Sequence, residues 1–545
     1  MKKLKLIFKT NKVELLIIFL SLIFSSWLMF STFSYKDGNM LIASKAWSDF
    51  ASHIPLIRSF SLGNNFPPQY PLFSGPPIKY HFLFYAFVGL LEKFGLRIDY
   101  SLNIPSALGF FLLMTIIYFF AKEIFKSKAV GILSVLFFIF NSSLSFLKFF
   151  TLYPFSSHTL LNIINNQKFI SFGPYDQSII SAFWNLNIYT NQRHLALSYA
   201  LSLFLIYLTL KFKENDRKNN LKKALAIGII LGLSFFLNMA VFIMTIAIFT
   251  CMFLLFSKKR IYLFISLILG GIIAFPQYLY IQSGVSTFKP FINPGYLVTN
   301  LNILNFINYW WQNLGLNLIF IPLGFIIAAR HEKKILLSFF SLFIIGDLFQ
   351  FSPEIAANHK FFNLFVVVGA MFSAYFLNFL WKKKNYLKLL VAIFIFLLIF
   401  SGIIDFFPIY NDYKIALPDY LVNKDISWIM KNTKPDSVFL NTQYLYDNAS
   451  LAGRKIFLGW PYFAWSQGYN TDIRGSIRDS ILLSLTKTQA CTLLKNNNIQ
   501  YIELNKLTFD TNIPKPSSIF FDKFKSIYSN PTSGYSILDV RENCY

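Results

Sequence analysis

Two side chains that can move protons lie four residues apart in the early segment WSDFASHIPLIRSF. Asp49 and His53 would share one face of a helix here, because residues four positions apart lie above one another along a helix. A carboxylate in such a place can act as a general base that takes the proton of an acceptor hydroxyl or amine. We therefore identify Asp49 as the candidate catalytic residue and His53 and the nearby His81 as candidate substrate-binding residues. A solvated helix face with an incidental ion pair is the alternative.

Cations that could hold a phosphate stand in two later clusters. Arg193 and His194 lie together where an apolar run begins, and Asp176 precedes them. His359 and Lys360 form the second cluster, in the segment SPEIAANHKFF. An arginine can donate two parallel hydrogen bonds to a phosphate, and a lysine offers a compact positive charge. We interpret these five residues as candidates for binding a donor phosphate or substrate. A membrane-surface anchor for Arg193 and a helix-end cap for the second cluster are the alternatives.

The same residues raise the question of a metal. Asp49, His53 and His81 could offer oxygen and nitrogen ligands to a divalent cation. Their spacing matches no metal-binding motif, and the sequence contains no CxxC pair and no HExxH. We therefore assign no metal ligand, and a divalent metal stays open as a cofactor.

The elements that must position these residues are mostly membrane spans. The chain has 545 residues, of which 55% are hydrophobic and only 14% are charged, whereas a soluble domain is about 25% charged. The net charge of +25 would suggest nucleic acid on a soluble protein. In a membrane protein, Lys and Arg instead mark cytoplasmic loops that face anionic lipid, so no nucleic acid is expected as a partner. No P-loop is present, which argues against a pump with its own nucleotide-binding domain.

Apolar runs predict about eleven transmembrane helices. They cover residues 13–34, 101–121, 129–147, 194–212, 224–238, 240–256, 261–281, 313–329, 335–351, 363–380 and 386–408. The first run is interpreted as an uncleaved anchor, because no A-x-A cleavage site follows it. The run 224–256 is too long for one span, and Asn238 interrupts it. We predict two short helices that meet at a polar junction, with Asn238 as a further candidate substrate-binding residue, because broken helices are tolerated where they line a cavity. A single tilted helix is the alternative.

The distribution of basic residues predicts the orientation. With the N-terminus inside, the inside segments contain about 24 Lys or Arg in about 50 residues, and the loops between spans on the outside contain about 11 in about 155. The long loops 35–100, 148–193, 282–312 and 352–362 then all lie outside, together with residues 409–545. Loops of this length are usually functional or disordered, and their aromatic and proline content argues against disorder. A surface helix over 44–60 and a second, interfacial one over 82–94 are expected within the first loop.

The last part of the chain has a different composition and predicts a small α/β domain. Its candidate strands are Val438–Asn441, Lys455–Leu458, Tyr501–Leu504 and Tyr535–Val540, and its candidate helices are Lys424–Lys431 and Thr486–Asn496. Cys491 and Cys544 both lie here and could pair if the domain is outside the cytoplasm, whereas Cys251 lies in an apolar run. The predicted organisation is therefore a transmembrane domain, 1–408, that includes the outer loop 35–100, followed by an extracytoplasmic domain, 409–545.

Taken together, these segments resemble the GT-C glycosyltransferases, the superfamily of protein O-mannosyltransferases, aminoarabinose transferases and oligosaccharyltransferase catalytic subunits. The resemblance covers residues 13–408. It rests on the early acid in WSDFASH, the stretch FPPQYPLFSGPPIKYHFLFYAFVGLLEKFGL, the two spans in NIPSALGFFLLMTIIYFFAKEIFKSKAVGILSVLFFIFNSS, and the helix pair in GIILGLSFFLNMAVFIMTIAIF. Many members have paired acids in the first outer loop, whereas Asp49 stands alone between Ser48 and Phe50.

The resemblance implies a function. A polyprenyl-phosphate-linked sugar would be the donor, basic residues would hold its phosphate, and the sugar would pass with inversion to a glycan, lipid or protein acceptor activated by Asp49. The chain would be a multi-pass protein of the plasma membrane. Two other classes stay open: a transporter or flippase of lipid-linked glycans, and a non-catalytic envelope-assembly protein. Spans nearly free of charge, with polar groups gathered in the outer loops, favour a surface active site over a transport path.

Overall fold

The computed structural model describes residues 12–171, 181–213, 216–283, 288–505 and 510–544. In this part of the chain, six helices are long and apolar enough to cross a membrane, and two shorter helices bent by 87° relative to each other would form a seventh span. The chain is therefore an integral membrane protein. The six are α2 (Lys12–Thr32), α5 (Ile98–Phe125), α11 (Arg193–Leu210), α14 (Arg260–Gln282) with the short η3 (Ser257–Lys259) before it, α18 (His359–Lys383) and α19 (Asn385–Tyr410); the bent pair is α15 (Ile303–Leu314) and α16 (Asn317–Ile327).

Every predicted apolar run contains a helix, but not every run is one long helix. The remaining runs form α6 (Lys128–Ile139), α12 (Arg217–Leu233), α13 (Met239–Leu255) and α17 (Arg330–Leu348), which are shorter or less apolar than the six. The count of about eleven transmembrane helices and their orientation remain predictions.

Two predicted spans are interrupted where polar residues turn the backbone. The predicted span 129–147 ends early because the side chain of Asn141 accepts hydrogen bonds from the backbone N–H and the hydroxyl of Ser143, which compete with helical bonding. The chain then resumes as α7 (Ser145–Leu152). The predicted span 313–329 breaks at Gly315, whose φ is 52° and whose missing side chain leaves room for the carbonyl oxygen of Ser142.

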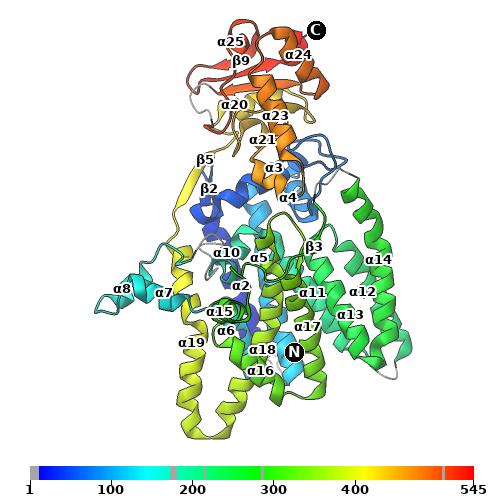
Figure 1. Ribbon diagram of the computed structural model, residues 1–545, viewed down its shortest axis with the longest axis vertical. Helices are drawn as coiled ribbons and strands as arrows, with labels where there is room; N and C mark the ends of the chain where they lie inside the picture. The colour runs from blue at the N-terminus through cyan, green and yellow to red at the C-terminus, as the bar shows by residue number, and fades with distance from the viewer. Residues whose placement is uncertain (1–11, 172–180, 214–215, 284–287, 506–509, 545) are drawn as a thin grey trace, which may run out of the picture.

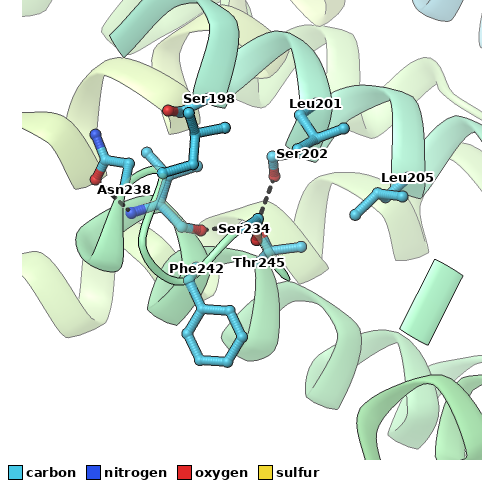
Figure 2. Close-up of a pocket in the computed structure, with 10 residues that line it drawn as sticks. Ser198, Leu201, Ser202, Leu205, Ser234, Asn238, Phe242 and Thr245 are labelled. Atoms are coloured by element: carbon cyan, nitrogen blue, oxygen red, sulfur yellow. Dashed lines mark hydrogen bonds between the residues drawn. The ribbon is translucent and has the colours of Figure 1, made fainter. Parts of the chain in front are cut away.

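The broken helix predicted within 224–256 is confirmed. α12 ends at Leu233, and α13 starts after Asn238, whose side chain accepts a hydrogen bond from the backbone N–H of Val241 at 3.2 Å. Asn238 is therefore the N-cap of α13. A small polar cavity lies at this junction, where Ser202 and Thr245 hydrogen-bond at 2.7 Å across the facing helices (Figure 2).

The first long loop is folded rather than spread over the membrane surface. The predicted helices 44–60 and 82–94 correspond to η1 (Ser44–Ala46) with α3 (Trp47–Ser61), and to α4 (Leu83–Lys93). α3 was expected on the surface, but its residues are buried nearly all round, including Phe50, Ile54 and Arg58. The reason is that the C-terminal part of the chain packs over it and shares one hydrophobic core with it.

Strands tie this loop to the C-terminal part of the chain. β2 (Asn39–Ala43) pairs antiparallel with both β1 (Phe33–Lys36) and β5 (Lys414–Pro418), so a three-stranded sheet joins the start of the first loop to the segment after α19. In Figure 1, β2 and β5 lie side by side between the helical bundle and the C-terminal domain, which occupies one end of the long axis. Loops elsewhere carry shorter elements: α8 (Thr159–Ile164), α9 (Ser181–Trp184), α10 (Asn187–Asn191), β3 (Phe291–Ile292) paired with β4 (Phe349–Gln350), and η4 (Ile355–Asn358).

The C-terminal domain is α/β, and the strands predicted from its sequence form one sheet. Its strand order is β7-β6-β8-β10-β9, with β6 parallel to β7 and β8 and the rest antiparallel. The strands are β6 (Val438–Leu440), β7 (Lys455–Ile456), β8 (Tyr501–Asn505), β9 (Ser526–Asn530) and β10 (Tyr535–Asp539); the helices are α20 (Lys424–Asn432), α21 (Asn448–Leu451), α22 (Pro461–Trp465), α23 (Thr471–Leu482), α24 (Lys487–Asn496), α25 (Ile519–Asp522) and α26 (Val540–Cys544). A disulfide joins Cys491 on α24 to Cys544 on α26, which confirms the pairing that the sequence left open.

Candidate active site

The helix that carries Asp49 is fixed from above by the C-terminal domain. The hydroxyl of Tyr446 donates a hydrogen bond to the backbone carbonyl of Trp47 at 2.6 Å, and the two rings lie 4.2 Å apart. Near the C-terminal end of the same helix, the buried Arg58 forms ion pairs with Asp419 at 2.8 Å and with Glu92 on α4 at 3.1 Å. α3 is thus held at both ends, and the position of Asp49 depends on this docking.

The side chain of Asp49 is partly exposed, but its surroundings make ionisation of the carboxyl group unfavourable. The ammonium of Lys360, at the start of α18, acts electrostatically on its carboxylate, and the side chain of Asn191 on α10 hydrogen-bonds to it. Burial raises the pKa of Asp49 to about 6, against the lowering effects of Lys360 and Asn191. A carboxyl with this pKa is mostly ionised at neutral pH and is still a better base than an ordinary aspartate.

Three of the four histidines predicted as site residues form a cluster that includes His53 of α3. Nε2 of His81 and Nε2 of His194 are 2.7 Å apart, and Nδ1 of His194 lies 2.7 Å from the hydroxyl of Tyr85. His53 stacks on the ring of Tyr85 at 4.6 Å, and no ion pair joins it to Asp49 among the described residues. We call His53, His81, His194 and Tyr85 the histidine cluster.

The histidine cluster is neutral at physiological pH. Burial lowers the pKa of His53 to about 3, with Arg193 and Lys360 as further causes, and lowers the pKa of His81 well below its ordinary value. Because neutral imidazoles have one donor and one acceptor nitrogen, His81 and His194 share a single proton along their contact. The cluster can therefore donate and accept hydrogen bonds, but it does not supply positive charge.

Arg193 is engaged inside the protein. Its guanidinium is fully buried and donates to the carbonyl of Thr190 at 2.7 Å, the hydroxyl of Thr32 at 2.7 Å and the amide oxygen of Asn103 at 3.2 Å. It also lies over the ring of Phe50 at 5.3 Å. This arrangement joins α2, α5 and α3 at the start of α11, so Arg193 acts as a positioning residue for the site rather than as an open anion-binding group.

Of the two residues in the second cationic cluster, only Lys360 offers a partly exposed positive charge to the site. His359 is buried, stacks on Phe183 at 4.4 Å and contacts the side chain of Asn363. Lys360 is partly exposed, and its charge acts on Asp49 and on all three histidines of the cluster. Asn238 belongs to the helix junction described above. Asp176 lies outside the described residues.

The donor set does not fit a divalent metal. In the described ranges, no group of three or more His, Cys, Asp or Glu side chains converges on one point. Asp49, His53 and His81 do not point their donor atoms at a common centre, because His53 stacks on Tyr85 and Nε2 of His81 faces His194. No step of the proposed mechanism is therefore routed through a metal.

Several site residues were missed from the sequence. Tyr80, Tyr85 and Tyr446 lie within electrostatic reach of Asp49, and Asn191 interacts with it directly. Tyrosines and asparagines are frequent in this chain and carry no spacing signal of their own. Only the loop IKYHFLFY, which places Tyr80 and Tyr85 on either side of His81, could have suggested two of them.

Comparison with solved structures identifies the architecture. The arabinofuranosyltransferase AftD from Mycobacteria superposes with a TM-score of 0.53 over 97% of this chain, at 11% sequence identity. The chain has a GT-C-type fold. It spans 40% of the length of AftD, so the GT-C-type fold alone, and no activity, follows from this likeness.

The chain is also similar to a second solved structure. The oligosaccharyltransferase of Archaeoglobus fulgidus, solved with a tethered acceptor peptide, gives a TM-score of 0.49 and 12% identity, covering 98% of this chain and 74% of that one. No protein-family model and no curated protein matches the sequence.

Proposed function

We propose that the chain is a membrane glycosyltransferase that moves a sugar from a polyprenyl-phosphate donor to an acceptor on the outer face of the plasma membrane. The observation that carries the proposal is the electrostatic interaction between Asp49, a carboxyl with a raised pKa on α3, and the partly exposed ammonium of Lys360 at the start of α18. Perturbed acids beside a single complementary cation are typical of catalytic sites. The GT-C-type fold supports the same reading.

The chemistry assigned to this pair is a displacement at the anomeric carbon. The acceptor oxygen attacks that carbon, its proton passes to the carboxylate of Asp49, and the bond from the anomeric carbon to the phosphate oxygen breaks. The leaving phosphate keeps the electron pair, and Lys360 stabilises the charge that develops on it. Arg193, which lies over Phe50, and the histidine cluster, which includes His53, hold α3 and with it Asp49 in position.

Substitution of Lys360 tests the role of the cation. Lys360→Met is expected to lower kcat/KM for the polyprenyl-phosphate donor by ~10-fold or more, since a hydrogen bond to a charged group contributes ~1.5–3 kcal/mol. It also removes a charge that lowers the pKa of Asp49. The acid limb of the pH–rate profile, near pH 6 in the wild type, should therefore move up by roughly one pH unit. Lys360→Arg should keep the limb in place; an unmoved limb in Lys360→Met would exclude contact between the two charges.

The transfer itself is tested with purified protein in lipid nanodiscs. Radiolabelled short-chain polyprenyl-phosphate sugars, including arabinofuranose and mannose, are supplied with envelope glycan, and label reaching the glycan is measured. Label that crosses liposome membranes without being transferred would favour the transporter class instead. We favour the transferase over that class because the charged site groups sit at helix ends and in loops rather than along the spanning helices.

Sidedness is a separate prediction. A disulfide forms and persists in oxidising compartments, so Cys491–Cys544 supports placing the C-terminal domain outside the cytoplasm. In a Cys251→Ser background, Lys523→Cys should react with a membrane-impermeant maleimide on intact cells, whereas Lys383→Cys should react only after permeabilisation. The reverse pattern would contradict an outer-face active site.

A further inference from the structure

A second site lies between the C-terminal domain and the first outer loop. A cleft of about 600 Å³, within the size range of ligand sites, opens along the sheet of the C-terminal domain. Val438, Lys455 and Tyr501 line it; each is the first residue of its strand, and the three strands are parallel and adjacent. The first residues of adjacent parallel strands lie at one edge of a sheet, so the cleft runs along that edge. Gln69 and Gly75 of the first outer loop form the opposite wall.

Its charge is strongly one-sided. Four cations line the cleft, Lys434, Lys455, Arg474 and Arg541, against one carboxylate, Asp436. Lys455 is only 9% exposed, and within the described residues no carboxylate lies at ion-pair distance from it or from Arg474. The charge of Asp436 acts on Lys455 from beyond ion-pair distance, and a buried ammonium without a paired anion is costly. The protein side chains that line the cleft therefore carry a net positive charge.

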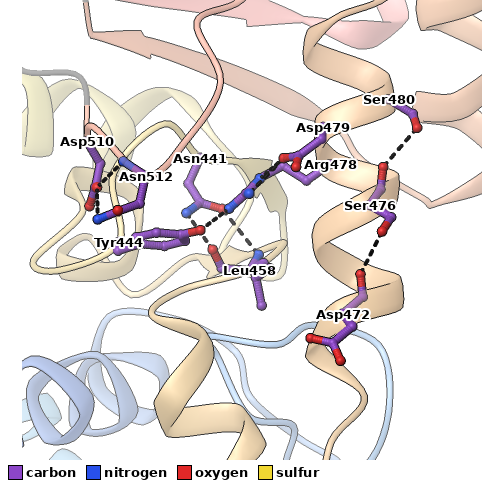
Figure 3. A network of polar contacts seen from close by, with 10 residues as sticks. All are labelled: Asn441, Tyr444, Leu458, Asp472, Ser476, Arg478, Asp479, Ser480, Asp510 and Asn512. Atoms are coloured by element: carbon purple, nitrogen blue, oxygen red, sulfur yellow. Dashed lines mark hydrogen bonds and ion pairs between the residues drawn. The ribbon is translucent and has the colours of Figure 1, made fainter.

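Arg474 is held in place before any ligand arrives. Its guanidinium lies between the rings of Phe73 and Phe457, at 4.2 and 4.4 Å from their centroids. One turn further along α23, Arg478 is buried and bonded to Asp479 and to the hydroxyl of Tyr444, which fixes the helix against the domain (Figure 3). Burial lowers the pKa of Arg474 to about 10, so it stays charged at neutral pH.

The opposite end of the cleft is fixed as well. Arg541 lies on α26 and Asn496 lies on α24, and the disulfide Cys491–Cys544 joins these two helices. The only carboxylate recorded near the guanidinium of Arg541 among the described residues is Asp539, at 3.9 Å. A preorganised set of cations in which only Arg541 has a carboxylate at ion-pair distance, within the described residues, is an anion-binding surface.

The amide side chains indicate what kind of anion fits. Five amides line the same cleft: Asn496, Asn497, Asn498, Gln69 and Gln500. Gln500 is bonded to the backbone through both amide atoms, and Gln69 and Asn497 through one each, so Asn496 and Asn498 offer the most open amides. Amides donate to and accept from hydroxyl groups, which is how proteins recognise sugars. The C-terminal domain stands at one end of the long axis of the molecule (Figure 1), and the test below uses zwitterionic lipid so that anionic headgroups do not occupy the cleft.

We propose that this cleft binds an anionic saccharide chain, through carboxylate or phosphodiester groups on Lys455 and Arg474 and hydroxyl groups on the amides. The proposal rests on the proposed transferase function in one respect only: it takes the bound saccharide to be the acceptor of the transferred sugar. A negatively charged acceptor glycan would lie along the sheet edge, and its growing end would reach the site at Asp49. Binding here would then determine which glycan is extended.

The test measures binding separately from transfer. Full-length protein in nanodiscs of zwitterionic lipid is titrated with hexagalacturonate, with a glycerol-phosphate hexamer and with neutral maltohexaose. At least one anionic probe is expected to bind at least ~10-fold tighter than maltohexaose, and the tighter anion identifies the group recognised. Raising the salt from 50 to 500 mM should weaken the anionic probe alone. The double variant Lys455→Gln, Arg474→Gln should lose most of this preference. Lys523→Gln removes the same charge from the same domain outside the cleft and should change affinity less than about 2-fold.

The outcomes separate the two proposals. Equal affinity for anionic and neutral probes, or affinity that salt does not change, would overturn the cleft assignment even if the double variant failed to fold. A chain that binds hexagalacturonate but transfers no sugar would contradict the transferase and leave the cleft standing. A protein that transfers sugar but does not prefer an anionic probe would contradict the cleft assignment and leave the transferase proposal standing.

Discussion

Asp49→Asn is expected to lower kcat for sugar transfer by ~10³-fold, because general-base catalysis contributes about 10²–10⁴-fold. Asparagine has nearly the same shape as aspartate and keeps the contact with Asn191, but it cannot take a proton at neutral pH. The wild-type rate should fall as the pH drops through about 6, because the base is lost as the raised pKa of Asp49 is crossed. The variant should show no such limb.

The measurement is transfer of labelled sugar under single-turnover conditions, with KM for the donor determined alongside. If Asp49 acts only in the transition state, kcat falls while KM changes little. Ser48→Ala, next to Asp49 and exposed, is the matched control and should keep wild-type activity. Unchanged transfer in Asp49→Asn would remove the carboxylate from the mechanism and leave Lys360 without a catalytic partner.

The candidate site was partly predictable because its charged members are rare in this chain. Asp49 and Lys360 drew attention as an acid and a cation in outer loops, and the structure brings their charges within reach of each other. Arg193 drew attention for the same reason, yet its donors are used by Thr32, Asn103 and Thr190. Residue type shows that a charge needs a partner, but only the tertiary fold decides whether that partner is a ligand or the protein.

The fold was likewise predictable where it depends on local sequence and not where it depends on tertiary packing. The long helices and the strands of the C-terminal domain were predictable because runs of apolar residues are a local signal in the sequence. The burial of α3 could not be found, since it depends on packing against residues almost 400 positions later, such as Tyr446 on Trp47. The Asn141 break was also missed, although its signal, NSS at the end of an apolar run, is visible in the sequence.

Arg58→Met is expected to destabilise the docking of the C-terminal domain by ~3–5 kcal/mol, because removing one partner of a buried ion pair leaves the other charge uncompensated. Here two carboxylates, Glu92 and Asp419, would be left within the core. Burial already raises the pKa of Glu92, and loss of Arg58 removes the charge that opposes this effect. The expected signs are a lower midpoint of thermal unfolding and faster proteolysis near residues 411–423.

The triple variant Arg58→Met, Glu92→Gln, Asp419→Asn separates charge from shape. Its buried groups are neutral and nearly the same size, so it should regain most of the lost stability, as expected when a buried ionic group is replaced as a whole. Because α3 carries Asp49, transfer should fall in Arg58→Met and recover in the triple variant. Recovery of stability without recovery of transfer would mean that Arg58 does more than hold α3. A single variant as stable as the wild type would mean that the hydrophobic core shared by α3 and the C-terminal domain fixes Asp49 without the ion pairs.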